Sequence, residues 1–229
     1  MAGRPRRRLS ALASQHARQH RPVSETTRSS ARDGSRRITP PGGIGDAPVY
    51  LRNPEADDAT EFLGLMLRSR RLHHPWIQPP VTEAGFRAYL SRMAREDHQG
   101  FLVCRRDNHA IAGVINVNNI VHGAFLSGSL GYYSVEVQAA RGYMSEGLKQ
   151  VIRIAFEDLG LHRLEANIQP GNARSIALVR RLGFRREGFS PAYLYIDGAW
   201  RDHERWALVD ARATLLPPGI PDEVARRIP

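Results

Sequence analysis

The feature that most restricts the fold is a long apolar strand that runs through a short glycine-containing loop directly into an amphipathic helix. The pattern predicts a strand over 125–137 and a helix over 144–159, with Gly142 in the loop between them. The first helical turn has unbonded backbone N–H groups, and the helix dipole adds partial positive charge. Such a junction suits a phosphate, and Arg141 adds a cation beside it. A purely structural turn is the alternative, since the loop has neither a Walker lysine nor the two-glycine dinucleotide fingerprint.

The remaining pattern alternates between strands and helices. Strands are predicted at 49–51, 100–106, 110–117, 118–122, 163–168, 189–196 and 200–209, and helices at 57–72, 82–97 and 172–182. The Asp107-Asn108 and Asp197-Gly198 pairs indicate hairpin turns. An antiparallel start followed by a strand–helix–strand unit predicts an α/β domain with a mixed, mostly antiparallel central sheet and helices on both faces.

The chain of 229 residues predicts one domain with two appendages. We place an Arg-rich tail at 1–46, the folded domain at 47–212 and a Pro-rich tail at 213–229. The formal net charge is +10, but residues 1–46 hold ten arginines and three acids, so that this segment alone carries +7. The folded part is close to neutral, and its charge does not indicate a nucleic-acid surface.

The N-terminal segment contains no aromatic residue, so it cannot bury enough apolar surface to fold, and we predict disorder over 1–46. Its arginines could contact RNA or the ribosome, a targeting segment is a second interpretation, and a solvated tail is the third. The sequence shows no apolar run long enough to span a membrane and no secretory signal. We therefore expect a cytoplasmic protein, as a monomer or a homodimer.

The single cysteine, Cys104, excludes an intramolecular disulfide and a cysteine-based zinc cluster, and it fits a reducing compartment. Its apolar neighbours predict a packed side chain rather than a nucleophile. The histidines His122, His162 and His203 are scattered without metal-ligand spacing. We predict no metal site, and we expect these histidines to make structural hydrogen bonds.

Two long stretches resemble the GNAT (Gcn5-related) N-acetyltransferases, and within them the ribosomal-protein alanine/serine N-acetyltransferases of the RimJ/RimL type. They are "RGYMSEGLKQVIRIAFEDLGLHRLEANIQPGNARSIALVRRLGFRREG", residues 141–188, and "YLYIDGAWRDHERWAL", residues 193–208. With a weaker similarity from Tyr50 onward, the resemblance covers residues 48–210. It implies the GNAT fold, in which two neighbouring strands splay apart at the site of acetyl-CoA.

The resemblance also implies a set of cofactor-binding residues. The loop Arg141, Gly142, Tyr143, Met144 and Ser145 is expected to bind the pyrophosphate of acetyl-CoA through main-chain N–H groups. The splay is expected beside Glu136 and Val137, and Asn172 is expected to contact the pantetheine arm, or to act as a helix N-cap. Ala139 departs from the family pattern, which usually has Gln or Arg there, so a side-chain contact at that position is in doubt.

Acetyl transfer to an amine needs a neutral amine, an oxyanion donor and a proton for the leaving thiolate. Many family members use a tyrosine as the acid, at a position that resembles Val179 here, which cannot donate a proton. In the alanine/serine branch a serine takes this role, and Ser175 matches it; a local hydrogen bond to the first helical turn is the alternative.

Glu165 matches a strand glutamate that some relatives use as the base, directly or through water. Strand alternation places Glu165 and Asn167 on one face of the sheet. Glu136 is the rival base, and a structural ion pair is the other interpretation of Glu165.

The resemblance alone implies the acceptor, the N-terminal alanine of a ribosomal protein. A small amine such as an aminoglycoside, or a non-catalytic acyl-CoA sensor, are the alternatives. We expect the acceptor pocket to be lined by Trp76, Asn118, His122, Tyr133, Tyr193 and Tyr195.

Overall fold

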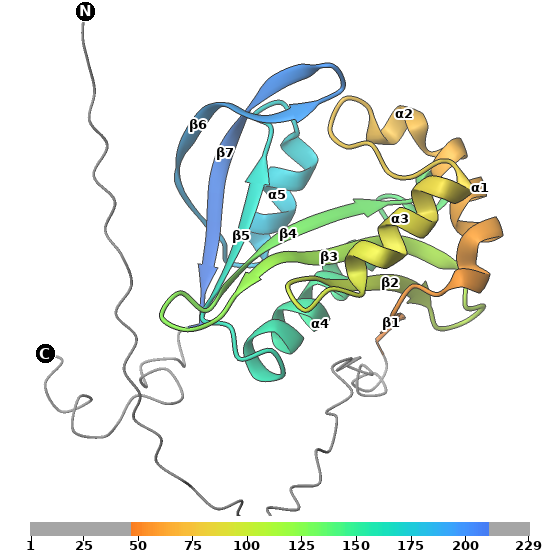
Figure 1. Ribbon diagram of the computed structural model, residues 1–229, viewed down its shortest axis with the longest axis horizontal. Helices are drawn as coiled ribbons and strands as arrows, with labels where there is room; N and C mark the ends of the chain where they lie inside the picture. Colours follow the sequence, from red (N-terminus) through yellow and green to blue (C-terminus); the bar gives the residue numbers. More distant parts are fainter. Residues whose placement is uncertain (1–46, 211–229) are drawn as a thin grey trace, which may run out of the picture. The chain divides into compact units, whose positions relative to one another are not determined.

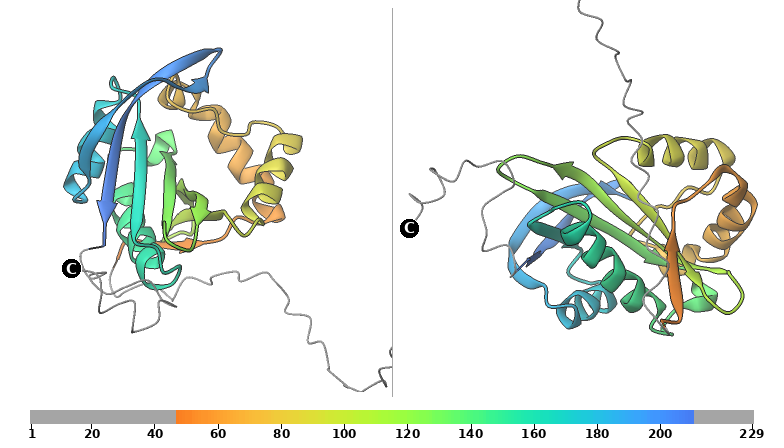
Figure 2. Two further views of the ribbon diagram at one scale, coloured as in Figure 1. Left: turned by 60° about the vertical axis from the view of Figure 1, so that its left-hand side comes forward. Right: turned by 90° about the horizontal axis from the view of Figure 1, so that it is seen from below.

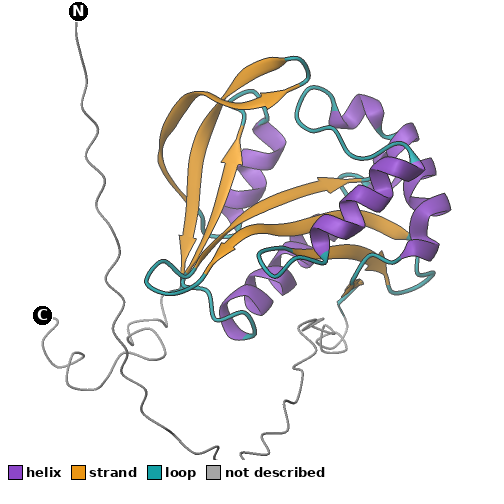
Figure 3. Cartoon of the chain, viewed as in Figure 1, coloured by secondary structure: helices purple, strands orange, loops and turns teal. Residues whose placement is uncertain are grey.

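The computed structural model describes residues 47–210, which form a seven-stranded mixed sheet with helices on both faces (Figures 1 and 3). The strand order is β1-β2-β3-β4-β5-β7-β6, and only the β4–β5 pair is parallel. The expected α/β class with a mostly antiparallel sheet is confirmed. The tails expected at 1–46 and 213–229 lie outside the described residues. Within residues 47–210, no helix is both long and apolar enough to cross a membrane.

The elements follow the predicted order. The strands are β1 (Val49–Arg52), β2 (Gln99–Arg105), β3 (Ile111–Val121), β4 (Ser127–Ser134), β5 (Arg163–Ile168), β6 (Arg185–Ile196) and β7 (Ala199–Val209). The α-helices are α1 (Ala59–Arg68), α2 (Arg70–His73), α3 (Glu83–Met93), α4 (Tyr143–Glu157) and α5 (Ala173–Arg181), with two 3-10 turns, η1 (Ala56–Asp58) and η2 (Glu136–Gln138).

Two predicted elements differ in the structure near the site. The strands predicted at 110–117 and 118–122 are one strand, β3, whose register with β4 shifts between Asn118 and Val121. The strand predicted over 125–137 ends at Ser134, and Glu136 and Val137 belong to η2 instead. The Ser134 hydroxyl bonds to the carbonyl oxygen of Val135 at 3.2 Å, and such local side-chain bonds to the backbone compete with the sheet ladder.

Helices lie on both faces of the sheet (Figure 2), and the core has one hydrophobic layer on each face. β2 shows why, because its alternate side chains serve both layers: Phe101 and Val103 pack on the α4 and α5 side, whereas Leu102 and Cys104 pack on the α1 and α3 side. The fully buried Cys104 confirms the predicted packing role. Gly147 brings α4 close to the sheet, since a Cβ there would stand 2.8 Å from a Val103 methyl carbon.

β4 and β5, the two central strands of the sheet, separate at one end because each is held by a different neighbouring element. β5 pairs with β7 along all of Arg163–Ile168, but it pairs with β4 only as far as Leu130. The far end of β4 is tied to the first helices: His73 Nε2 donates to the carbonyl oxygen of Ser134 at 2.9 Å, and the Glu136 N–H donates to the Ser69 hydroxyl at 2.9 Å. The expected splay is therefore present, but it begins after Leu130 rather than beside Glu136.

Candidate active site

The loop that leads into α4 has a left-handed backbone at Ala140 and Gly142, with φ values of 61° and 83°. Gly142 is the N-cap of α4. Within the described residues, Ser145 is the first residue of the helix whose N–H bonds to a backbone carbonyl, that of Gly142 at 2.9 Å. The N–H groups of Gly142, Tyr143 and Met144 are therefore left for another acceptor.

The space in front of this loop is open. Among residues 47–210, no heavy atom lies within 4 Å of the point where a Cβ of Gly142 would stand, apart from the adjoining residues of the chain. Arg141 is exposed, and no ion pair among residues 47–210 involves it. Free N–H donors, a helix dipole, a cation and open space together fit the anionic pyrophosphate of a nucleotide-type cofactor.

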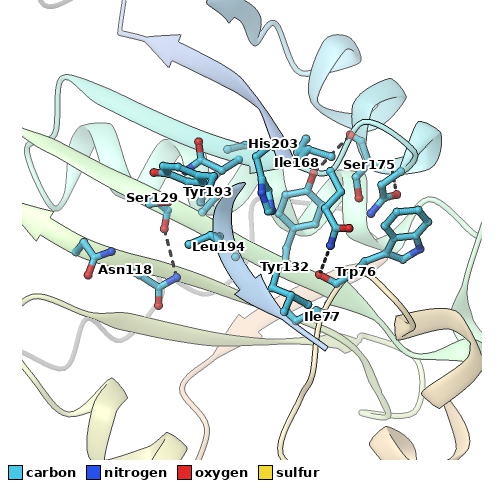
Figure 4. Close-up of a pocket in the computed structure, with 18 of the residues that line it drawn as sticks. Trp76, Ile77, Asn118, Ser129, Tyr132, Ile168, Ser175, Tyr193, Leu194 and His203 are labelled. Carbon is cyan, nitrogen blue, oxygen red and sulfur yellow. Dashed lines mark hydrogen bonds between the residues drawn. The ribbon is translucent and has the colours of Figure 1, made fainter. Parts of the chain in front are cut away.

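A pocket of about 480 Å³ lies at the splay and is lined from both faces of the sheet (Figure 4). Tyr132, Asn172 and Ser175 line it on the α5 side. Side chains from the other face, among them Asn167 and His203, line its second half. Its volume is within the usual range for small-molecule sites, roughly 300–1,000 Å³. The sheet opening therefore connects the expected cofactor side to a second binding region.

Ser175 lies in the first turn of α5, where Asn172 acts as the predicted N-cap. The Asn172 side-chain oxygen accepts a hydrogen bond from the Ser175 N–H at 3.2 Å, which fixes the start of the helix. The Ser175 hydroxyl bonds to the Tyr132 phenol, and the residue lines the pocket. Val179, one turn further, is fully buried in the core and cannot reach a substrate.

Tyr132 is a residue of this site that the sequence did not indicate. Its hydroxyl donates to the carbonyl oxygen of Ser175 at 3.4 Å, from β4 across to α5 (Figure 4). Burial raises the pKa of Tyr132 to about 12, although a side-chain hydrogen bond with the Ser175 hydroxyl opposes the shift. The phenol therefore keeps its proton at neutral pH and acts as a donor. A tyrosine pair on one strand gives no sequence signal of which member faces the site.

Glu165 is held by two arginines. Its carboxylate oxygens lie 2.9 Å from Arg163 Nε and 2.8 Å from an Arg205 guanidinium nitrogen. Burial opposes ionisation, but the bonds and charges of Arg163 and Arg205 outweigh it and hold the pKa of Glu165 below its ordinary value. Glu165 is not among the residues that line the pocket. This geometry favours the structural ion pair, the alternative that the sequence left open.

Glu165→Gln is expected to lower the free energy of unfolding by about 1–3 kcal/mol near neutral pH, because it leaves the partly buried Arg205 guanidinium without its carboxylate and Arg163 with Glu187 alone. A group whose folded pKa is depressed stabilises the fold above its unfolded pKa, and this stabilisation disappears as the pH falls through the folded pKa. The difference between wild type and variant, measured by urea unfolding, should therefore shrink below about pH 4.5.

The matched control is Glu83→Gln, whose carboxylate forms an exposed i,i+4 pair with Arg87. This control is expected to cost no more than about 0.5 kcal/mol. Acetyl transfer should persist in Glu165→Gln. A variant of unchanged stability that has lost turnover would contradict the ion-pair role and return Glu165 to the position of base.

Of the six residues expected to line the acceptor pocket, three line the pocket in the structure and three do not. Trp76, Asn118 and Tyr193 line it. His122 and Tyr195 are exposed and lie outside it, and Tyr133 is buried against α1 and α3 on the far side of β4. For His203 the sequence predicted a structural hydrogen bond; the structure shows that bond, to the Arg201 carbonyl oxygen, and also places the residue in the lining of the pocket. Within residues 47–210, no three His, Cys, Asp or Glu side chains are grouped as a metal site requires.

Comparison with known proteins agrees with this geometry. The family model described as an acetyltransferase (GNAT) domain matches residues 49–185. The [ribosomal protein uS5]-alanine N-acetyltransferase of Escherichia coli is 35% identical over 161 residues, which cover 66% of this chain and 82% of the relative.

Two solved structures share the fold. RimJ of Mycobacterium smegmatis, in complex with CoA-disulfide, superposes with a TM-score of 0.66 at 27% identity, over 73% of this chain and 84% of that one. The ribosomal-protein-S5-alanine acetyltransferase of Vibrio fischeri has the same TM-score, 0.66, at 26% identity, over 73% and 96% of the two chains. The chain therefore belongs to the GNAT acetyltransferases, in their RimJ/RimL-like branch, and is an acetyl-CoA-dependent N-acetyltransferase.

Proposed function

We propose that this enzyme acetylates the N-terminal α-amino group of a ribosomal protein that begins with alanine, in the cytoplasm. The observation that carries the proposal is the pocket through the splay, which joins Ser175 on one face of the sheet to a neutral polar region on the other. The similarity to the E. coli enzyme, whose name specifies an alanine of ribosomal protein uS5, supports the choice of acceptor.

We place acetyl-CoA along the α4 and α5 side of the splay. In the loop Arg141–Ser145, the free main-chain N–H groups of Gly142, Tyr143 and Met144 receive the pyrophosphate, since the space at Gly142 is open. The edge of β4 that parts from β5 after Leu130 offers backbone groups to the pantetheine arm, ahead of Glu136 and Val137. Asn172 lies on the same side, at the start of α5. M. smegmatis RimJ, which was solved with CoA-disulfide, supports this placement.

Within this arrangement Ser175 is the proton donor to the leaving sulfur. Its hydroxyl lines the pocket and bonds to the Tyr132 phenol, and the Asn172 cap and the Tyr132 contact with the Ser175 carbonyl hold the turn that carries it. An α-amino group has a pKa of about 8, so a substantial part of it is already neutral near pH 7 and a modest base is enough.

The lining of the pocket also bears on the small-amine alternative. Of its lining residues only two histidines are titratable near neutral pH, and the described lining contains no carboxylate. A polycationic amine such as an aminoglycoside or a polyamine would enter this region without a counter-charge, which is costly. Carboxamide side chains, from Asn118, Asn167 and Gln169, instead suit the N–H and C=O groups of a peptide backbone.

The test is calorimetric titration with acetyl-CoA, followed by thiol release in the presence of a peptide that carries the N-terminal sequence of a ribosomal protein beginning with alanine. We expect acetyl-CoA binding together with peptide-dependent thiol release and a mass gain of one acetyl group on the peptide. The control peptide is the same sequence with a blocked α-amine, which should give no release.

Each other result contradicts one part of the proposal. Thiol release with spermidine or an aminoglycoside, but not with the peptide, would reject the peptide acceptor and keep the chemistry. Acetyl-CoA binding without release with any amine would indicate an acyl-CoA sensor. Failure to bind acetyl-CoA would reject the cofactor placement. Ala139→Gln, which restores a residue typical of the family at this position, would then be the first variant to make.

A further inference from the structure

The second half of the pocket contains a histidine with one free nitrogen. His203 on β7 is only 2% exposed, and its ring lines the pocket in the middle of the side chains drawn in Figure 4. Its Nδ1 lies 2.9 Å from the carbonyl oxygen of Arg201. Because a carbonyl oxygen only accepts, Nδ1 must carry the hydrogen, and in the neutral ring Nε2 then keeps its lone pair. No recorded hydrogen bond among the described residues uses Nε2.

The sheet register places His203 on the acceptor face. Asn167 on β5 is paired with Arg205 on β7, and residues two positions apart on a strand share a face. His203 is therefore a diagonal neighbour of Asn167 on the face opposite to α4 and α5. The side-chain oxygen of Asn167 is buried and has no hydrogen-bond partner in the described part of the chain. Two unpaired acceptors thus lie together where an amine would enter from this face.

We propose that His203 is the general base of acetyl transfer, with Nε2 receiving the proton of the acceptor nitrogen and the oxygen of Asn167 accepting a second N–H. This assignment rests on the proposed function, because it takes the acceptor to be an amine that enters from the β6–β7 side.

The step balances as follows. The lone pair of the neutral acceptor nitrogen forms the N–C bond to the thioester carbonyl carbon, and the nitrogen, now cationic, loses one proton to Nε2 of His203. The C–S bond then breaks, and the sulfur keeps the electron pair and takes the proton of the Ser175 hydroxyl. The imidazolium returns its proton to the Ser175 oxygen through water. The net transfer is one proton from nitrogen to sulfur, with no other reactant.

The protonation state of His203 suits this role. Burial lowers the pKa of His203 below the usual histidine range, while its bond to Arg201 and the charge of Asp202 oppose the shift. The Asp202 carboxylate accepts a hydrogen bond from the Ala192 N–H at 2.8 Å. The Tyr193 ring packs edge-on against the imidazole of His203, with 5.6 Å between the ring centroids. The ring is therefore neutral near pH 7 and ready to accept a proton.

The charged groups around His203 are already paired or neutral. On β7 the Arg205 guanidinium binds Glu165 of β5 and lies over the Tyr193 ring of β6, 4.8 Å from its centroid. From β4 the site receives the Tyr132 phenol, which burial keeps protonated. The Arg201 Nε donates to the Ile196 oxygen at 3.3 Å. No group in this set competes with Nε2 for the acceptor proton at neutral pH.

The test compares wild type, His203→Gln and His203→Ala with the alanine peptide. For wild type we expect kcat/KM to fall at acid pH through two ionisations, that of the peptide amine at about 8 and that of His203 below about 6.5. In His203→Gln we expect turnover about 10²-fold or more lower, with the lower ionisation absent and the acetyl-CoA affinity unchanged. Free imidazole should restore part of the turnover in His203→Ala, a result that a packing role would not produce.

The matched control is His122→Gln, an exposed histidine outside the pocket, which should behave as wild type. Wild-type turnover in His203→Gln would overturn the base assignment, and so would a loss of turnover that imidazole does not restore in His203→Ala. Absence of peptide acetylation by wild type itself would reject the proposed function instead, so the two failures are distinguishable.

Discussion

Ser175→Ala is expected to reduce kcat by about 10²–10⁴-fold, the usual contribution of a positioned general acid, with little change in acetyl-CoA affinity. The hydroxyl is the only group removed, and its bond to the Tyr132 phenol is lost with it. The helix start should survive, because Asn172 caps the Ser175 backbone N–H rather than its side chain. Steady-state thiol release with the alanine peptide, together with calorimetry for acetyl-CoA, measures both quantities.

Two further variants make this result specific. Ser91→Ala removes a serine hydroxyl from an exposed position of α3 and should leave kcat unchanged. Tyr132→Phe removes the second hydroxyl near the splay while keeping the ring. It should cost much less than Ser175→Ala, since the phenol positions the α5 turn and the Ser175 hydroxyl and is not itself the proposed proton donor. Wild-type kcat in Ser175→Ala, combined with a large loss in Tyr132→Phe, would contradict the assignment and identify the phenol as the acid.

Gly142→Val is expected to weaken acetyl-CoA binding by about 10–100-fold. The residue has a φ of 83°, a region that a β-branched side chain adopts only at a cost of roughly 1–3 kcal/mol. The new side chain would also project into the open space that the pyrophosphate needs, in front of the N–H groups of Tyr143 and Met144. Calorimetric titration with acetyl-CoA measures the change, and kcat at saturating acetyl-CoA should change much less.

Gly123→Val is the matched control for strain. Gly123 has a similar φ of 75° and equally open space around its missing Cβ, but it lies in the β3–β4 turn, away from the pocket. Both variants should lose comparable stability, and only Gly142→Val should lose affinity for acetyl-CoA. Equal affinities in the two variants would contradict the placement of the pyrophosphate at this loop.

Local patterns were enough for most elements. β5 was predicted with its observed bounds, since Leu164, Ala166 and Ile168 alternate with polar residues and face the core as expected. The α4 junction was also predictable, because a glycine before an amphipathic run is a local signal. The end of β4 was not, as it depends on Ser69 and His73, which are distant in sequence.

The site residues also fall into those that a local sequence motif indicates and those that depend on contacts between residues distant in sequence. The sequence by itself determined the family, the loop around Gly142 and the Asn172 cap with Ser175 three residues later, because these are motifs of neighbouring residues. Only the tertiary structure decided where Glu165, Tyr132 and His203 lie and which groups they contact. Arg205 lies 40 residues after Glu165 and pairs with it through the β5–β7 register, and Tyr132 meets Ser175 across the splay, 43 residues away. Charge neutralisation and burial follow from such long-range neighbours, which no local pattern of residues encodes.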